Sequence, residues 1–309
     1  MPKFHVSRSI EIAAPPEKVF EIVSDFEIWK EWSPWLIAEP DAELTISKNS
    51  NSVGSTYAWE GEVTGSGELE HLRLEAPRLI EDEIRFLKPW KSVSQVSFSL
   101  EPAGEGTRIT WNMDGKLPFF LFFMKGMMES MIGMDYRRGL MMLKEWIETG
   151  KVNSKVNIPG KEITESLRIM GVRRTSSFDE IESNMKRAID ELHQKLETAS
   201  IQQKGAMLTV YHKYDMKRKQ TEFTTGYIIP DSESIPAGLV EWSMPASPVF
   251  RVEHVGSYKH LGNGWTTAYM HTRHKKIKQS KLSPYEIYRN SPSDTEEADL
   301  VTDIYLPLK

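Results

Sequence analysis

One glutamate stands among aromatic residues in a short segment near the end of the chain. The segment is Tyr285-Glu286-Ile287-Tyr288. Because side chains alternate along a strand, Glu286 and Tyr288 should share one face, with Tyr285 and Ile287 on the other. A carboxylate in apolar surroundings either pairs with a cation or has its pKa raised by loss of solvent. The segment therefore predicts a site for a cationic or aromatic molecule, and the plainer alternative is a solvent-facing strand glutamate.

Further aromatic residues of the C-terminal half are candidates for the walls of such a site. Trp265 follows Gly262-Asn263-Gly264 at the start of a predicted helix, and the tyrosines are Tyr211, Tyr227, Tyr258 and Tyr288. Faces of Tyr and Trp attract cations, but the same residue types also fill ordinary cores. Each is a candidate ligand-binding residue, and the alternative for each is a purely structural role.

The same pattern of segments occurs twice between residue 160 and the C-terminus. Thr209-Val210-Tyr211 recurs 77 residues later as Glu286-Ile287-Tyr288, and residues 225–230 recur as residues 302–307. A duplicated β-α-β-β unit cannot bury its sheet face alone, so the two copies should pair around a shared groove. Thr209 in the first copy corresponds to Glu286 in the second, which would give that groove one polar end.

The N-terminal half has the pattern of one strand, a helix, many strands and a long helix. Residues 3–12 alternate between apolar and polar and predict a strand. Pro15 and Pro16 suit the first turn of a helix. A long helical segment covers residues 129–149 and ends near Gly150, a suitable C-cap. Alternating segments between turn residues predict antiparallel strands at 55–62, 66–75, 79–86, 92–101 and 107–114.

This order of elements, with the residues at its ends, resembles the START-like family (SRPBCC, or polyketide cyclase-like). The residues that carry the resemblance are Ile12-Ala-Ala-Pro-Pro-Glu-Lys-Val-Phe20, Asp25 with Trp29 and Trp32, and Gly139-Leu-Met-Met-Leu-Lys-Glu-Trp146. The resemblance implies a helix-grip fold, with a curved antiparallel sheet around a long C-terminal helix and a hydrophobic cavity between them. We expect this domain at residues 1–152.

The C-terminal half begins after a polar stretch. Residues 153–161 contain Pro159-Gly160 and show no periodicity, which predicts a linker. A helix is predicted over 177–198, and its opening Ser177-Phe-Asp-Glu180 fits a capping box. A second helix is predicted over 258–276. The expected strands are 165–174, 207–214, 222–230, 248–255, 284–290 and 300–306.

Residues 162–309 resemble the GyrI-like family, the effector-binding fold of multidrug-responsive and AraC-type transcription regulators. The residues that carry this resemblance are Ile169–Arg174, Thr224–Pro230, Phe250–Tyr258, Trp265, Tyr285–Tyr288 and Thr302–Leu308. The resemblance implies a duplicated β-α-β-β domain in which Glu286 is the central polar residue of the ligand pocket. The chain as a whole is then an α+β protein of two domains.

Composition narrows the function classes. The chain has no cysteine, which removes disulfides, thiolate metal sites and cysteine nucleophiles. The start of the chain has no apolar core of a secretory signal, and we expect a cytoplasmic protein. Net charge is −5, and the one basic cluster, residues 271–281, is better explained as a solvated helix end than as a DNA contact. We expect no cofactor, no metal, no direct nucleic acid partner and no membrane span.

The most apolar stretch of the chain is residues 117–124, Leu-Pro-Phe-Phe-Leu-Phe-Phe-Met. It is far shorter than the ~20 residues of a membrane span. We expect it to be buried or to line a pocket rather than to lie at a membrane surface. Methionines follow it at 127, 128, 131 and 134, and these suit either a pocket wall or gate or an ordinary core.

Two functions follow from these patterns, with a third as a lesser possibility. The first is binding of small hydrophobic or cationic aromatic molecules, for sensing, sequestration or transport, with a second cavity in the START-like domain. The second is hydrolysis of reactive small molecules, in which Glu286 would be the general base and Tyr288 or Tyr258 would stabilise the leaving group. The third is an interaction module that modulates a partner such as a topoisomerase, by family analogy. Ligand identity and oligomeric state stay open.

Overall fold

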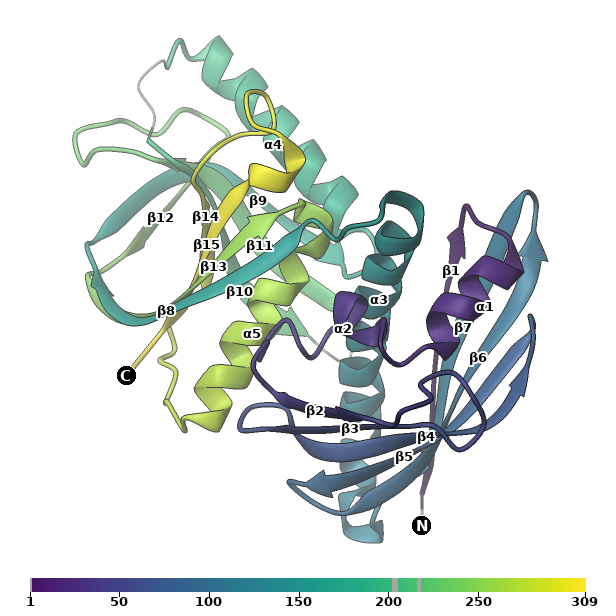
Figure 1. The fold of residues 1–309 in the computed structure, drawn as a ribbon. Coiled ribbons are helices and arrows are strands. Elements are labelled where there is room, and N and C mark those ends of the chain that lie inside the picture. Colours follow the sequence, from purple (N-terminus) through teal and green to yellow (C-terminus); the bar gives the residue numbers. More distant parts are fainter. Residues whose placement is uncertain (1, 202–204, 216–217) are drawn as a thin grey trace. The chain divides into compact units, whose positions relative to one another are not determined.

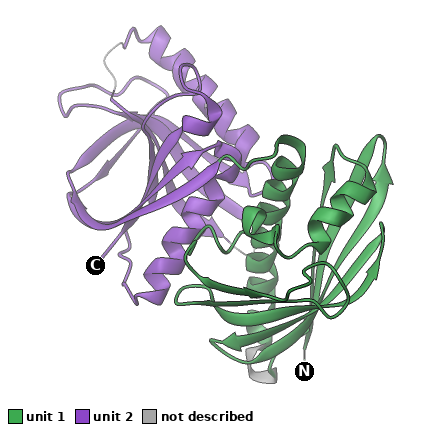
Figure 2. Ribbon diagram, viewed as in Figure 1, with its two compact units in different colours: residues 1–153 green, residues 154–309 purple. Residues whose placement is uncertain are grey.

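The protein consists of two units that are each built from one antiparallel sheet and its helices. The computed structural model describes residues 2–201, 205–215 and 218–309. It divides into unit 1, residues 1–153, and unit 2, residues 154–309 (Figure 2). Both units combine helices with a mostly antiparallel sheet, so the predicted α+β class is confirmed.

Unit 1 contains a seven-stranded sheet in the order β1-β7-β6-β5-β4-β3-β2 (Figure 1). Apart from β1, which closes on β7, each strand pairs with its neighbour in sequence, as expected for alternating segments joined by hairpins. The strands are β1 (Lys3–Ile12), β2 (Glu43–Ile46), β3 (Thr56–Gly61), β4 (Gly65–Glu75), β5 (Leu79–Lys88), β6 (Ser92–Ala103) and β7 (Gly106–Lys116).

Four helical elements complete unit 1. They are α1 (Pro16–Ser24), α2 (Trp29–Trp32), η1 (Phe119–Met124) and α3 (Lys125–Thr149). Pro16 begins α1, where its missing N–H is not needed. The long helix α3 starts four residues before the predicted position, and Gly150 ends it with a φ of 78°, which only glycine adopts without strain. The predicted helix-grip arrangement is confirmed, with α3 lying against the sheet (Figure 1).

The space between the sheet and α3 is filled by aromatic rings. Trp111 of β7 stacks on Tyr136 of α3 with ring centroids 3.9 Å apart, and Phe98 of β6 lies 5.0 Å from Trp111. Trp29 and Trp32 of α2 contact the same cluster. All five rings are buried. In this conformation, the interior where a START-like fold would hold a ligand is therefore occupied by the protein's own side chains.

A buried polar pair lies at one side of this cluster. His71 Nδ1 lies 2.5 Å from Asp82 Oδ1, and His71 Nε2 donates to the carbonyl oxygen of Ser24 at 2.9 Å. The His71 ring stacks on Phe26, and neither member of the pair is exposed. Burial raises the pKa of Asp82, which the hydrogen bond and the charge of His71 partly offset. The pair ties β4 and β5 to the end of α1.

Unit 2 contains an eight-stranded sheet in the order β12-β9-β11-β10-β14-β15-β13-β8. The strands are β8 (Ser154–Thr164), β9 (Leu167–Ser177), β10 (Met207–Asp215), β11 (Gln220–Ile228), β12 (Val240–Met244), β13 (Ser247–Gly256), β14 (Tyr285–Tyr288) and β15 (Val301–Pro307). The helices are α4 (Ile181–Thr198), η2 (Tyr258–His260), α5 (Leu261–His274) and η3 (Glu297–Asp299). The predicted duplication is therefore present as β9-α4-β10-β11 and β13-α5-β14-β15.

Two local predictions for unit 2 differ from the structure. Most of the expected linker, residues 153–161, lies in strand β8, which pairs with β13 and packs Val156 and Ile158 on the core. Its apolar residues alternate with polar ones, and the free edge of β13 supplies the partner. The expected capping box is absent, because α4 begins at Ile181 and Ser177 instead donates a hydrogen bond to the Glu180 carboxylate.

The two copies meet at the centre of the sheet, where β10 pairs with β14. Thr209 lies directly opposite Glu286, and Val210 lies opposite Tyr285. On one side of this pair lie β11 and then β9, and on the other side lie their counterparts β15 and then β13. The two halves of the sheet are therefore symmetric about the pair. Thr209 and Glu286, which occupy equivalent positions of the two copies, are therefore neighbours in space.

Candidate functional site

Glu286 lies at the middle of the unit 2 sheet, beneath both helices. Its strand β14 is four residues long and lies between β10 and β15. Trp265 reaches the carboxylate from α5, and Met185 reaches the neighbouring Tyr288 from α4. Tyr285, on the opposite face of the strand, stacks on Tyr305 at 4.8 Å. The alternation of the strand thus separates a polar, helix-covered face from an apolar one.

Three neutral donors hold the Glu286 carboxylate. The hydroxyl of Tyr288 donates to Oε1 at 2.6 Å and that of Tyr211 donates to the same oxygen at 3.0 Å. The indole N–H of Trp265 donates to Oε2 at 2.6 Å. The hydroxyl of Thr209 lies 3.0 Å from that of Tyr288 and extends the network across the central strand pair. The two copies and one helix therefore share a single polar network.

The carboxylate is fully buried and has no cation beside it. Its exposed fraction is 0%, and no Lys, Arg or His in the described part of the chain forms an ion pair with it. Burial raises the pKa of Glu286, and the hydrogen bonds from Tyr288, Trp265 and Tyr211 offset only part of that rise. A buried charge normally requires a partner of opposite sign. Among the described residues, no positive charge therefore offsets the cost of ionising Glu286.

The tyrosines around the carboxylate serve as donors and not as bases. Burial, and then the charge of Glu286, raise the pKa of both Tyr211 and Tyr288 well above the ordinary value. Their hydroxyls therefore keep their protons at neutral pH and remain hydrogen-bond donors. Aromatic contacts extend this wall, since Tyr211 packs edge-on against Trp265 at 5.2 Å and Trp265 stacks on Tyr269 at 6.3 Å.

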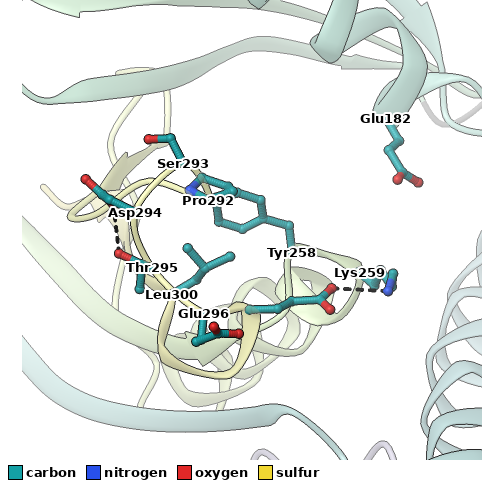
Figure 3. Close-up of a pocket in the computed structure, with 10 residues that line it drawn as sticks. Glu182, Tyr258, Lys259, Pro292, Ser293, Asp294, Thr295, Glu296 and Leu300 are labelled. Carbon is teal, nitrogen blue, oxygen red and sulfur yellow. Dashed lines mark hydrogen bonds and ion pairs between the residues drawn. The ribbon is translucent and has the colours of Figure 1, made fainter.

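Tyr258 connects this network to an open pocket. Its ring packs edge-on against Tyr288 at 5.5 Å, and burial together with the charge of Glu286 raises its pKa to about 12. The pocket has a volume of about 590 Å³, and in Figure 3 the Tyr258 ring projects toward Pro292 and Ser293. Contacts therefore run from the pocket through Tyr258 and Tyr288 to Glu286, although Glu286 itself does not line the pocket.

The rim of this pocket is predominantly acidic. Its lining includes Glu182 from α4 and three acidic residues of the loop between β14 and β15, against a single lysine. Those three are Asp294, Glu296 and Glu297. Glu297 pairs with Lys259 at 3.1 Å. The remaining excess of carboxylates gives the rim a negative charge that attracts cations. An ionised Glu286 has the same sign of charge.

The structure brings together most, but not all, of the candidate residues. Glu286, Tyr288, Tyr211 and Trp265 form one hydrogen-bonded cluster, and Tyr258 touches it. Tyr227 is directed elsewhere: its hydroxyl lies 2.9 Å from His193 Nε2 and its ring stacks on that histidine. Sequence reasoning did not predict Met185 or Glu182 at the site. The sequence contained a signal for the position of Thr209 alone, because Thr209 stands in the first copy where the second copy has Glu286.

Neither a metal nor a membrane-spanning helix is indicated by the geometry. Across residues 2–201, 205–215 and 218–309, no three His, Asp or Glu side chains gather in a way that could hold a metal ion. No helix within these same residues is long and apolar enough to cross a membrane. The site offers a carboxylate, hydroxyls and aromatic faces, which suit recognition of an organic molecule.

Comparison with known proteins assigns each half to a family. Residues 3–148 match the family model of polyketide cyclase / dehydrase and lipid transport proteins. Residues 162–309 match the GyrI-like small molecule binding domain. The two families together indicate small-molecule binding. A search of curated proteins gives no match.

Three of the solved structures that match this chain each cover about half of it, at low sequence identity. The Aha1 dimer from Colwellia psychrerythraea is 21% identical, with 48% of this chain and 98% of that chain covered and a TM-score of 0.37. CalU16 from Micromonospora echinospora is 17% identical, with coverage of 48% and 87% and a TM-score of 0.34. The EcmrR C-terminal domain is 17% identical, with coverage of 50% and 98% and a TM-score of 0.42. The two family matches follow one another along the chain. The chain is therefore a fusion of a polyketide cyclase-like (SRPBCC) domain and a GyrI-like small-molecule-binding domain.

Proposed function

We propose that unit 2 binds hydrophobic cations, most favourably aromatic ones, and that Glu286 neutralises their charge. The observation that carries this proposal is the fully buried carboxylate, which has no cationic partner among the residues that the structure describes. The aromatic rings of Trp265, Tyr211, Tyr258 and Tyr288 would surround the ligand and add cation–π attraction. The acidic rim of the pocket would raise the local concentration of cations before they bind.

Binding requires a local rearrangement at Tyr258 and Tyr288. These two rings separate the pocket from the carboxylate, and Glu286 already accepts three hydrogen bonds within the protein. A cation that displaced the Tyr258 ring could approach Oε1 while Tyr211 and Trp265 continue to donate. The loop between β14 and β15 lines the pocket and is the segment that would move with the ligand. The protein would thus serve as a sensor, sequestering protein or carrier.

The test compares a cation with its uncharged isostere. Benzyltrimethylammonium and neopentylbenzene have the same shape and differ by one charge. We expect isothermal titration calorimetry to show the cation binding at least about tenfold more tightly to the full-length chain. Equal affinities would mean that shape and apolar contact govern the site, and the proposal would be wrong.

The affinity for a permanently charged cation should rise with pH. Because burial raises the pKa of Glu286 above the ordinary 4.5, the free protein holds a proton on this group at pH values where an exposed glutamate has lost it. The cation binds the ionised form, so affinity is lost as pH falls through this raised pKa and levels off above it. The stability of the free protein depends on pH with the opposite sign. Because the pKa of Glu286 is raised in the folded state, the free energy of unfolding declines as pH rises through that pKa.

Thermal-shift measurements across a pH series check this dependence. The stabilisation by a saturating quaternary ammonium ion should increase from acidic to neutral pH, because the ligand's own charge is constant. The same series with Glu286→Gln should be flat. A parallel rise in both proteins would assign the dependence to other groups.

Hydrolysis is the second candidate function. A raised pKa makes the Glu286 carboxylate a stronger base than an exposed one, which is the property that general-base catalysis on water requires. Tyr288 or Tyr258 would stabilise the leaving group. The two candidates separate in one experiment, because Glu286→Gln should abolish turnover of a substrate while leaving measurable binding of it.

Two further elements of the proposal concern the rest of the chain. A second hydrophobic cavity in unit 1 would need some of the rings around Trp111 to move, because they fill that interior. We propose no direct nucleic acid contact for this chain. Its basic cluster, residues 271–281, begins in the last turn of α5, where the helix dipole favours positive charge.

A further inference from the structure

The end of the apolar stretch 117–124 is not buried as the sequence suggested, and the side chains of residues 119–121 lie outside the described part of the structure. Leu117 is in the core, but Phe122 is 59% exposed and Phe123 is 70% exposed. Met127, one turn further along α3, is also exposed. The expectation of burial is therefore wrong for the end of this segment. Large exposed aromatic side chains of this kind are uncommon on a protein surface without a binding role.

A second exposed apolar group lies at the same end of unit 1. The turn between β5 and β6 carries Trp90, which is 57% exposed, flanked by the exposed Leu87 and Val93. The pairing of Ser94 with Gly115 brings the start of β6 beside the end of β7. Because η1 follows β7 directly, the turn and η1 lie at one edge of the sheet. We call Leu87, Trp90, Val93, Phe122, Phe123 and Met127 the apolar tip.

Lysines surround the apolar tip. Five of the ten lysines in residues 1–153 lie at this end of the domain: Lys3, Lys88, Lys91, Lys116 and Lys125. Lys3 pairs in register with Lys116 at the edge of the sheet. Residues 1–150 carry 16 Lys and Arg against 24 Asp and Glu, so this grouping of positive charge runs against the average of the domain.

The acidic side chains nearest to the tip are already engaged. Glu60 pairs with Lys88 at 2.6 Å, and Glu129 pairs with Lys125 at 3.7 Å. Asp114 lies 2.9 Å from the ring of His5. Lys3, Lys91 and Lys116 form no ion pair among the described residues of the chain. Positive charge therefore remains available at the edge of an exposed aromatic surface.

We propose that the apolar tip docks unit 1 onto an anionic lipid surface. Trp and Phe at a protruding turn are suited to the interfacial layer of a bilayer, and lysines around them attract acidic headgroups. A second copy of the chain fits this end less well, because a two-fold contact would place lysines against lysines. The docking is peripheral and involves side chains of the turn, Phe122 and Phe123 of η1, and Met127 at the start of α3.

The experiment is flotation of the full-length protein with lipid vesicles. We expect it to float with vesicles of phosphatidylcholine mixed with phosphatidylglycerol, much less with phosphatidylcholine alone, and less as salt is added. The partition coefficient of the variant Trp90→Ser/Phe123→Ser should be about tenfold or more lower than that of the wild type. Lys91→Glu/Lys116→Glu should lose the preference for the anionic lipid.

A matched control uses exposed apolar residues of unit 1 that lie outside the tip. Val53 and Leu72 are 62% and 43% exposed, and Val53→Ser/Leu72→Ser should float like the wild type. An equal loss in this control, or no flotation of the wild type, would overturn the proposal. Sedimentation velocity without lipid gives another contradicting outcome. If the wild type self-associates and Trp90→Ser/Phe123→Ser abolishes this association, the apolar tip binds a second copy of the chain and the proposal is wrong.

Discussion

Replacing Glu286 by glutamine should weaken the binding of a hydrophobic cation by roughly 2–5 kcal/mol, the range for removing one partner of a buried charge pair. That corresponds to a loss of affinity from about thirtyfold to several thousandfold. The loss should be selective, because a neutral aromatic ligand gains nothing from the carboxylate charge. Calorimetric titration of wild type and Glu286→Gln with benzyltrimethylammonium and neopentylbenzene measures the change in affinity for the charged and for the neutral ligand.

The hydrogen bonds around Glu286 determine which controls are needed. A glutamine amide can accept from Tyr211 and Tyr288 through its oxygen, but its NH₂ group would then face the indole N–H of Trp265. An unpaired buried donor has its own free-energy cost, about 1–3 kcal/mol. The double variant Glu286→Gln/Trp265→Phe removes that conflict, and its comparison with Trp265→Phe alone isolates the effect of charge.

Tyr211→Phe is the matched control for the network without loss of charge. It removes one neutral donor to Oε1 and should change cation affinity by only about 1 kcal/mol. If Tyr211→Phe and Glu286→Gln weaken binding equally, the carboxylate is a structural member of the network and not the recognition element. If Glu286→Gln leaves affinity intact but stops turnover of a substrate, the hydrolase function is supported instead.

Trp111→Ala should destabilise unit 1 by about 3–5 kcal/mol, the usual range for removing a large aromatic from a core. Trp111 is 2% exposed and contacts Tyr136, Phe98, Trp32 and Trp35. Its removal leaves a cavity between the sheet and α3 that the rigid rings around it cannot close. Urea unfolding followed by tryptophan fluorescence measures the change, and seven of the nine tryptophans lie in residues 1–153.

Trp90→Ala provides the matched control for this measurement. Trp90 is largely exposed in the β5–β6 turn, so the same substitution there should change the free energy of unfolding by less than about 0.5 kcal/mol. Indole added to the Trp111→Ala protein should restore part of the lost stability by filling the cavity. A loss below about 1 kcal/mol in Trp111→Ala would mean that the interior is loosely filled and has room for a natural ligand.

Local sequence patterns predicted most of the secondary structure. Alternation located β1 and the hairpin strands of unit 1 to within a few residues, and Gly150 correctly marked the end of α3. The patterns failed where the decisive partner is distant in the chain. Residues 154–164 form a strand because the edge of β13 pairs with them, and the short alternation around Val156 and Ile158 does not by itself indicate such a distant partner.

Most of the candidate site residues come together in one cluster, but their connections were not predicted. Glu286 and Tyr288 were expected to share a face of one strand, and their direct hydrogen bond agrees with that alternation. The contacts of Met185 and Trp265 depend on how α4 and α5 cross the sheet, which the sequence does not encode locally. Tyr227 was grouped with the site by residue type alone, whereas its hydroxyl meets His193 on α4.

By itself, the sequence determined the two-domain order, the duplication in the second half, and one glutamate where the first copy has a threonine. The domain order follows from the resemblance of each half to a family, and the duplication and the glutamate follow from comparing equivalent positions of the repeat. Only the tertiary structure placed Thr209 opposite Glu286, buried that carboxylate without a cation, and left Phe122 and Phe123 exposed. Burial is decided by which segments cover a residue, and those segments come from elsewhere in the chain.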